Sequence, residues 1–278
     1  MKNITTKNMK TMKKWILCGT RKIRSGGKYL RKWGCAKVQI IAEITYMCPC
    51  KCWFCPFRNY SSRETMNIRF FAKAARVFAE FFKGQVLKLI ISGGEPSVLP
   101  NLRQYVDYAK NLGYYVTIAT NVFKPEVLEE AKPHFYQVSI DYWGEKHDKI
   151  RGVQGLFSRA LKFVEEHENA YIRSTIMNDN IEDIVKLAEW SIKHGKPLFA
   201  MPIKGCKIGL ELRKLRKNKA ILIANHCPAG RKQLVIDPKG NIYPCIFYRK
   251  HLGNIRKQPI SKIYEKAKTI KPFPCLNQ

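Results

Sequence analysis

Four cysteines lie close together in the segment Cys48-Pro49-Cys50-Lys51-Cys52-Trp53-Phe54-Cys55. Three of them, Cys48, Cys52 and Cys55, have the spacing C-x3-C-x2-C. Three thiolates on one tight loop can hold three irons of a [4Fe–4S] cluster and leave the fourth iron open to a small chelating ligand. Structural zinc normally takes four ligands, often in C-x2-C or C-x4-C pairs, so it fits this spacing less well. No set of three ligands that includes Cys50 has a spacing that fits as well as Cys48, Cys52 and Cys55. We therefore interpret Cys50 as a thiol that does not bind the cluster, although its place inside the motif leaves the ligand assignment slightly open.

Polar residues and glycines follow the later strand-like segments of the chain. They are Gly93, Gly94, Glu95, Asn121, Ser139, Asp141 and Arg151. Together these side chains could bind a polar, charged ligand. Several of them also have a simpler interpretation: the glycine pair could form only a turn, Asn121 could be a turn residue, and Asp141 and Arg151 could form a structural ion pair.

Strand-like and helix-like segments alternate from residue 37 onward. The strand-like runs are 37–46, 86–92, 114–119, 135–140, 171–176 and 197–203, and the helical patterns lie near 63–83, 100–112, 125–132, 156–168 and 180–194. This alternation predicts an α/β fold with a parallel sheet and crossover helices. Six such units can form a partial (β/α)6 TIM-like barrel, in which functional groups sit at the C-terminal ends of the strands.

The βα pattern stops near residue 205. A hairpin-like stretch follows, with the turn Pro238-Lys239-Gly240-Asn241, and then a short helix near 259–268. We therefore expect three parts: a basic amphipathic arm at 1–36, the partial barrel at 37–205, and a small C-terminal α+β module at 206–278.

The formal net charge is +30, from 51 Lys and Arg against 21 Asp and Glu. Such an excess implies an anionic partner. We expect a membrane surface slightly ahead of nucleic acid, because the arm interleaves Trp15, Tyr29 and Trp33 with basic residues, as amphipathic anchors do. A generally basic surface is the alternative.

The ten cysteines are better explained by metal or redox chemistry in the cytosol than by disulfides. No apolar run approaches the ~18 residues of a membrane span, and no long apolar segment follows the N-terminal lysines. We expect a cytoplasmic protein, and the arm allows a peripheral position at the inner face of the membrane.

These motifs resemble those of the radical S-adenosylmethionine (radical SAM) superfamily. The cysteine motif has an aromatic residue, Phe54, before its last cysteine. Gly93-Gly94-Glu95 resembles the family's GGE motif, and Thr120-Asn121 resembles its TNG motif with Val122 in place of glycine. The segment from Ser139 to Gly152 resembles the stretch SLD…HDxIRG.

The resemblance implies cofactors and roles for these residues. A [4Fe–4S] cluster on Cys48, Cys52 and Cys55 would reductively cleave S-adenosylmethionine to a 5′-deoxyadenosyl radical, which abstracts a hydrogen atom from the substrate. The electron would come from a donor such as ferredoxin or flavodoxin. The residues implied to bind S-adenosylmethionine are Phe54, Gly93, Gly94, Glu95, Asn121, Ser139, Asp141 and Arg151.

The C-terminal cysteines resemble another part of this superfamily. The segment from Cys227 to Cys245 is similar to the opening of the SPASM and twitch extensions, which hold auxiliary Fe–S clusters. The chain lacks the later run of cysteines of a full SPASM domain, which favours the shorter twitch form with one auxiliary cluster. Cys227, Cys245 and Cys275 would be its ligands, with Cys206 as a candidate fourth. The alternative is that these cysteines hold no cluster.

Several functions fit these features. The first is radical modification of a peptide or protein, and the second is radical chemistry on a membrane lipid. RNA modification is a third, motivated by charge alone. A non-catalytic, basic Fe–S or zinc protein that binds nucleic acid would leave the GGE-like and HDxIRG-like motifs unexplained.

Overall fold

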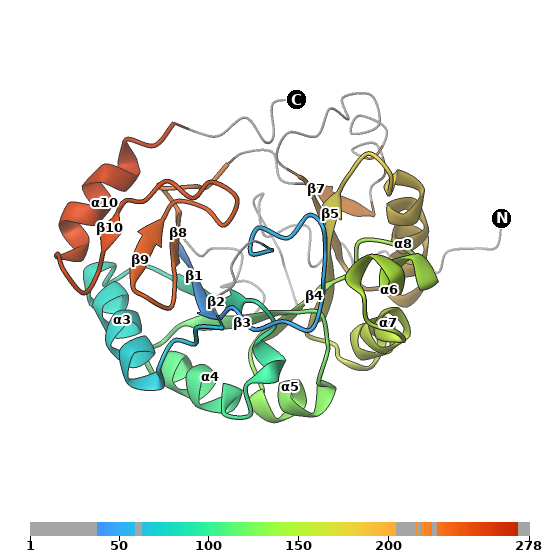
Figure 1. Cartoon of the computed structure of the whole chain (residues 1–278), viewed down its shortest axis with the longest axis horizontal. Coiled ribbons are helices and arrows are strands. Elements are labelled where there is room, and N and C mark those ends of the chain that lie inside the picture. The colour runs from blue at the N-terminus through green and yellow to red at the C-terminus, as the bar shows by residue number, and fades with distance from the viewer. Residues whose placement is uncertain are drawn as a thin grey trace, which may run out of the picture.

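The chain folds around one mostly parallel sheet of ten strands, described here from a computed structural model (Figure 1). The structure describes residues 38–58, 63–203, 215, 218, 220–223 and 227–271. The predicted arm at 1–36, Cys206 and Cys275 lie outside these residues.

The strands follow the order β10-β9-β8-β1-β2-β3-β4-β5-β6-β7 across the sheet. They are β1 (Val38–Thr45), β2 (Leu87–Gly93), β3 (Tyr115–Thr120), β4 (Phe135–Ser139), β5 (Ala170–Ile176), β6 (Leu198–Pro202), β7 (Ile221–Ile223), β8 (Gln233–Ile236), β9 (Asn241–Tyr243) and β10 (Gly253–Asn254). Neighbours from β1 to β7 pair in parallel. The six predicted strands are thus confirmed, and the sheet curves without closing, as a partial barrel does.

Helices follow the strands and lie outside the arc that they form (Figure 1). They are α3 (Ile68–Phe81), η2 (Pro96–Val98), α4 (Leu102–Asn111), α5 (Pro125–Ala131), α6 (Glu145–Arg151), α7 (Leu156–Glu166), α8 (Ile181–His194) and α10 (Ile260–Lys268). The helix predicted from residue 63 begins at Ile68, because the Asn67 side chain accepts a hydrogen bond from the Arg69 N–H at 2.8 Å and caps it there. Helix α6 was not predicted from the sequence. It is short and largely charged, and it therefore lacks an apolar stripe.

The C-terminal segment continues the barrel sheet. The predicted hairpin forms β8 and β9, and β8 pairs in parallel with β1 on the side away from β2. Helix α10 packs beside α3, where the Tyr264 ring lies 5.5 Å from that of Phe81 and 5.0 Å from that of Phe82. This arrangement brings residues from both ends of the described chain to the same side of the barrel.

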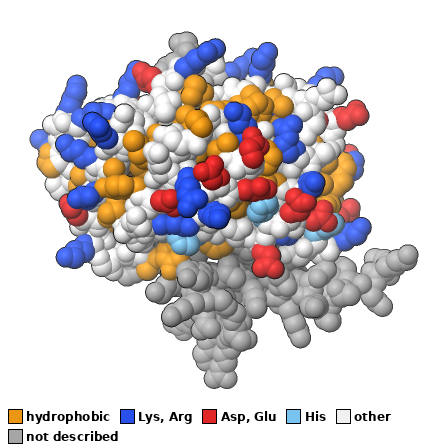
Figure 2. All heavy atoms as spheres, turned by 90° about the horizontal axis from the view of Figure 1, so that it is seen from below, with side chains coloured by type: hydrophobic (Ala, Val, Ile, Leu, Met, Phe, Trp, Pro, Cys, Tyr) orange, Lys and Arg blue, Asp and Glu red, His pale blue; other side chains and the backbone are white. Residues whose placement is uncertain are grey.

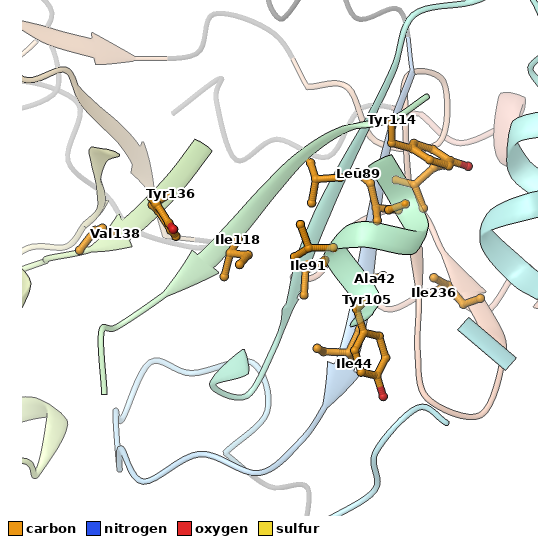
Figure 3. Packing of buried hydrophobic residues seen from close by; sticks show 14 of the residues in the cluster. Ala42, Ile44, Leu89, Ile91, Tyr105, Tyr114, Ile118, Tyr136, Val138 and Ile236 are labelled. Atoms are coloured by element: carbon orange, nitrogen blue, oxygen red, sulfur yellow. The ribbon is translucent and has the colours of Figure 1, made fainter. Parts of the chain in front are cut away.

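The main core lies between the sheet and the surrounding helices. Figure 3 shows Ile44, Ile91, Ile118 and Val138, which come from the neighbouring strands β1 to β4 and belong to one buried cluster. A smaller apolar cluster of Ile41, Ile90 and Val235 forms on β1, β2 and β8. Because the large cluster takes the helix-facing side of the strands, the other side is left to line the barrel interior.

The surface seen in Figure 2 carries both signs of charge, with Asp and Glu interspersed among Lys and Arg. This face is therefore not uniformly basic despite the net charge. In the described part of the chain, no helix is long and apolar enough to span a bilayer.

One buried ion pair joins the barrel to the C-terminal segment. Arg249 Nη1 lies 2.5 Å from Oε1 of Glu43, a fully buried residue of β1. The Tyr46 hydroxyl donates to the other carboxylate oxygen at 3.1 Å, and the Arg249 guanidinium stacks 3.9 Å from the Tyr243 ring centre. Burial raises the pKa of Glu43 to about 7, although Arg249 opposes the rise. The pair therefore fixes the C-terminal segment to the strand that precedes the cysteine loop.

We predict that Arg249→Met destabilises the protein in a pH-dependent way. At about pH 8 the variant must either bury a Glu43 carboxylate without its cation or bind a proton there, a loss of about 3 kcal/mol. At about pH 5 the loss is smaller, because a carboxyl group whose folded pKa is raised holds its proton there. That proton-linked stability fades as the pH rises from the ordinary value of 4.5 through about 7. Thermal unfolding midpoints of the variant and the unmodified protein, measured anaerobically at both pH values, test this.

The matched control is Lys239→Met. Lys239 pairs with Glu64 at 2.9 Å, but both side chains are largely exposed, at 61% and 37%. Exposed pairs contribute little, so this variant should unfold near the unmodified protein at both pH values. If Arg249→Met loses the same stability at both pH values, the raised pKa of Glu43 is contradicted.

Candidate functional site

The cysteine loop runs from the end of β1 across the open end of the barrel, drawn in blue in Figure 1. Backbone hydrogen bonds hold it at both sides. Gly94 N donates to Thr45 O at 2.6 Å, and Glu95 N donates to Met47 O at 2.8 Å. Further along the loop, Lys51 N donates to the carbonyl of Arg151 at 2.8 Å. The loop is thus fixed between the end of β2 and the end of α6.

All the predicted cofactor residues line one cavity of about 490 Å³, together with the cysteine loop. They are Phe54, Gly93, Gly94, Glu95, Asn121, Ser139, Asp141 and Arg151, accompanied by Cys48, Cys50, Cys52 and Cys55. The fold therefore brings together residues from the loop after β1 and from the ends of β2, β3 and β4, as the strand-end positions predicted.

The loop cysteines are free thiols facing this cavity. Asn121 Nδ2 lies 3.1 Å from Cys50 Sγ and 3.8 Å from Cys48 Sγ. A hydrogen bond from the Cys50 thiol lowers the pKa of Cys52 to about 7, and the charge of Arg151 adds to this. Burial raises the pKa of Cys55 to about 11.

Their arrangement fits a cluster better than a single ion. Within the described residues, no three Cys, His, Asp or Glu side chains are placed to hold one metal ion. In a [4Fe–4S] cluster each thiolate binds a different iron, so the sulfurs need not converge on one point. Soft thiolates on one loop are the donors that such a cluster requires.

Gly93 and Gly94 allow the cysteine loop to approach the end of β2. A Cβ atom on Gly93 would lie 2.2 Å from Thr45 O, and one on Gly94 would lie 2.1 Å from Met47 O. Gly93 also has a φ of +120°, which side chains disfavour. The family resemblance implied that these glycines bind S-adenosylmethionine. The structure adds a different reason, because the space is already taken by the backbone of the loop itself.

Glu95 joins the ends of β2 and β3. It is 1% exposed. Its Oε1 accepts from Ser97 N at 3.0 Å and from Thr120 Oγ1 at 2.6 Å, and its Oε2 accepts from Asn121 N at 2.7 Å. Burial raises the pKa of Glu95, and these hydrogen bonds oppose the rise. The carboxylate thereby holds Asn121 against the cysteine loop, and its role toward a cofactor amino group stays a prediction.

Asp141 and Arg151 form a buried ion pair, with Oδ2 and Nη2 2.5 Å apart. The other Asp141 oxygen accepts from Thr175 N at 2.7 Å. Two buried polar atoms at the cavity, Arg151 Nε and Asn121 Oδ1, have no hydrogen-bond partner among the residues that the structure describes. Buried polar atoms are rarely left unsatisfied, so a donor and an acceptor are available for a polar cofactor.

The auxiliary cysteines are placed only in part. Cys245 lines the same cavity, and Cys227 is close enough for its charge to act with burial in raising the pKa of Cys245. Both are free thiols. Cys206 and Cys275 lie outside the described residues, so the complete ligand set stays a prediction.

The motifs did not predict the part of the cavity wall that the strand interiors form. It includes Lys88 on β2, Gln137 on β4, and Tyr171 and Arg173 on β5. Their signal in the sequence is weak. Lys88 and Arg173 are single charged residues within strand-like runs, and only the barrel's curvature makes their side of the sheet an interior.

Two family models match the chain. The model described as the radical SAM superfamily matches residues 42–191, and SPASM, described as an iron-sulfur cluster-binding domain, matches residues 227–277. Both matches fall on the parts of the fold that carry the cysteines described above.

Curated relatives show modest identity. AdoMet-dependent heme synthase of Methanosarcina barkeri is 27% identical over 242 residues, which cover 66% of this chain and 69% of that protein. The subtilosin biosynthesis protein AlbA of Bacillus subtilis is 27% identical, covering 80% of this chain and 58% of AlbA. Mycofactocin maturase MftC of Mycolicibacterium smegmatis is 24% identical, covering 76% and 65%. The chain thus matches less than two thirds of the length of AlbA and MftC.

Solved structures share the fold. Streptococcus suis SuiB bound to precursor peptide SuiA superposes with a TM-score of 0.67 at 16% identity, over 93% of this chain and 76% of SuiB. Native anSMEcpe with bound AdoMet gives a TM-score of 0.65 at 15% identity, over 83% and 81%.

The motifs that suggested the family occupy one cavity in a partial barrel, and the superfamily model alone matches more than half of the 278 residues. The chain belongs to the radical S-adenosylmethionine superfamily, enzymes that use a [4Fe–4S] cluster and S-adenosylmethionine, and it carries an iron–sulfur SPASM domain at its C-terminal end.

Proposed function

We propose that the chain is a radical SAM enzyme that modifies a peptide or protein, with the radical cluster on Cys48, Cys52 and Cys55. One observation carries the proposal. A single cavity joins these thiols to the partnerless polar atoms of Asn121 and Arg151 and extends to Cys245. When bound, the cluster and S-adenosylmethionine supply the one-electron chemistry that removes a hydrogen atom from a substrate.

The protein's own residues would bind and orient the cofactor. Asn121 Oδ1 accepts a hydrogen bond and Arg151 Nε donates one, so they suit the amino and carboxylate groups of S-adenosylmethionine. Phe54 and Ser139 line the same wall. Because the Arg151 ion pair with Asp141 is buried, the guanidinium is held in place before the cofactor binds, which lowers the cost of ordering it.

A peptide or protein substrate is supported by the relatives. PqqA peptide cyclase of Ruegeria pomeroyi is named for a peptide and AlbA for biosynthesis of the bacteriocin subtilosin, and SuiB was solved with a precursor peptide. The basic arm, which motivated the membrane and nucleic-acid alternatives, lies outside the described residues. Those alternatives, and a ferredoxin or flavodoxin as the electron donor, stay predictions.

The first test concerns the radical cluster. The protein, reconstituted anaerobically and given S-adenosylmethionine and a reductant, should form 5′-deoxyadenosine. Cys48→Ala, Cys52→Ala and Cys55→Ala should each abolish it, because each removes one iron ligand. Cys50→Ala is the matched control on the same loop and should keep the activity, measured by chromatography of the nucleoside. An inactive Cys50→Ala beside an active Cys48→Ala would show that the ligand register is wrong.

The second test concerns the auxiliary site, which we propose holds one cluster on Cys227, Cys245 and Cys275. The reconstituted chain should bind about eight irons, since each cluster has four. Replacing Cys227 and Cys245 together by alanine should halve the iron content while the spectrum of the radical cluster persists. An iron content that does not change in this double variant would refute an auxiliary cluster on these residues.

A further inference from the structure

Two basic residues from different strands face the interior of the barrel, below the cysteine loop. Lys88 lies in β2, two residues before Ile90, and Arg173 lies in β5 between Tyr171 and Thr175. All five line the cavity. Since alternate residues of a strand point to the same side, both basic side chains belong to the inner wall and not to the helix-packed side.

Arg173 has no carboxylate partner among the residues that the structure describes. Its side chain contacts the Met201 sulfur, which lies 2.7 Å from Nη2 and is a weak acceptor. The two carboxylates that line the same cavity are engaged elsewhere. Asp141 binds Arg151 and Thr175 N, and Glu95 accepts from the ends of β2 and β3. The Arg173 guanidinium is therefore free to bind an anion.

Burial makes a positive charge costly in this interior. It lowers the pKa of Arg173. Burial, together with the charge of Arg173, also lowers the pKa of Lys88 to about 7. Buried charges are normally paired in the working state of a protein. An anionic group beside Arg173 would therefore relieve the desolvation cost of its guanidinium and reduce its repulsion of Lys88.

Arg173 also lies between the two sets of cysteines. Its charge interacts with Asp141, in the cofactor part of the cavity, and with Cys245, in the C-terminal segment. On the neighbouring strands, its register partners are Ser139 and Phe199. A ligand held by Arg173 would thus lie beside Ser139 and toward Cys245.

On the basis of the proposed function, we propose that Arg173 and Lys88 form a subsite for a carboxylate of the substrate. The carboxylate would belong to an acidic side chain or to the C-terminus of a peptide. A guanidinium matches the geometry of a carboxylate through two parallel hydrogen bonds, and Lys88 adds a second positive charge. The pair would thereby hold the substrate within the cavity that the predicted cofactor residues also line.

Ligand binding tests this without turnover. The full reconstituted chain, held anaerobically with saturating S-adenosylmethionine, is titrated with three probes followed by saturation-transfer NMR. The probes are N-acetylglutamic acid α-amide, with a side-chain carboxylate, N-acetylglutamine, with a terminal carboxylate, and the neutral N-acetylglutamine amide. At least one acidic probe should bind, and about tenfold more tightly than the neutral one. The stronger acidic probe identifies the source of the carboxylate.

The variants separate this role from a structural one. Arg173→Gln should weaken the acidic probe about tenfold, and Arg173→Lys should restore part of the binding. Arg103→Gln is the control, because Arg103 is half exposed and pairs with Asp107 on α4. Affinity for S-adenosylmethionine should stay unchanged. Because it removes a buried charge, Arg173→Gln should unfold at the same or a higher temperature. If it does not fold, Lys88→Met should show the same loss of probe binding.

Three results would overturn the inference: equal binding of acidic and neutral probes, unchanged acidic-probe binding in Arg173→Gln and Lys88→Met, or loss of S-adenosylmethionine affinity in place of probe affinity. The last would assign Arg173 to the cofactor. These outcomes differ from failure of the proposed function, in which the unmodified protein forms no 5′-deoxyadenosine whatever the probes do.

Discussion

The backbone of the cysteine loop rests directly on the end of β2, and the position of the whole site depends on this contact. Gly94 N donates to Thr45 O, and Glu95 N donates to Met47 O. The approach is so close that a single Cβ atom on either glycine would meet a carbonyl oxygen. Such contacts are possible only where glycine removes the side chain. The loop that carries the thiols is consequently fixed by main-chain geometry before any cluster binds.

From this contact, polar interactions pass from strand to strand. Glu95 fixes Asn121 at the end of β3, and Asp141 at the end of β4 holds Arg151 on α6. The carbonyl of Arg151 accepts a hydrogen bond from Lys51 N, which connects α6 to the cysteine loop. Strand β1, which leads into the cysteine loop, is joined to the C-terminal segment by the ion pair of Glu43 and Arg249. The site is thus assembled from groups that are buried and mutually paired, which favours a rigid cavity.

The barrel and the grouping of the motif residues around one cavity could be predicted because both follow short-range rules. Six βα units are visible as alternating apolar patterns. The motif residues other than Arg151, which is on α6, lie at strand ends or in the loops that follow, where a parallel barrel collects its functional groups. The reason for Gly93 and Gly94 could not be predicted in the same way. It depends on which segment of backbone lies above β2, and this is a long-range contact.

The residues of the interior wall could not be predicted from the sequence either. Lys88 and Arg173 are the only charged residues of their strands, and nothing in the local pattern shows that one side of the sheet faces a cavity. Helix α6 was missed because its charged residues give no helical apolar period, although it supplies Arg151. The ion pair of Asp141 and Arg151 had been considered only as a structural alternative. The structure shows that pairing, and within the described part of the chain the Arg151 Nε still has no hydrogen-bond partner.

The central claim is that the loop leaves one iron open for S-adenosylmethionine within this cavity. The most direct measurement is electron–nuclear double resonance of the reduced cluster with S-adenosylmethionine carrying ¹⁵N in its methionyl amino group. We expect a ¹⁵N hyperfine coupling, because the amino group would bind the open iron. A reduced cluster that binds S-adenosylmethionine with no ¹⁵N coupling would contradict it.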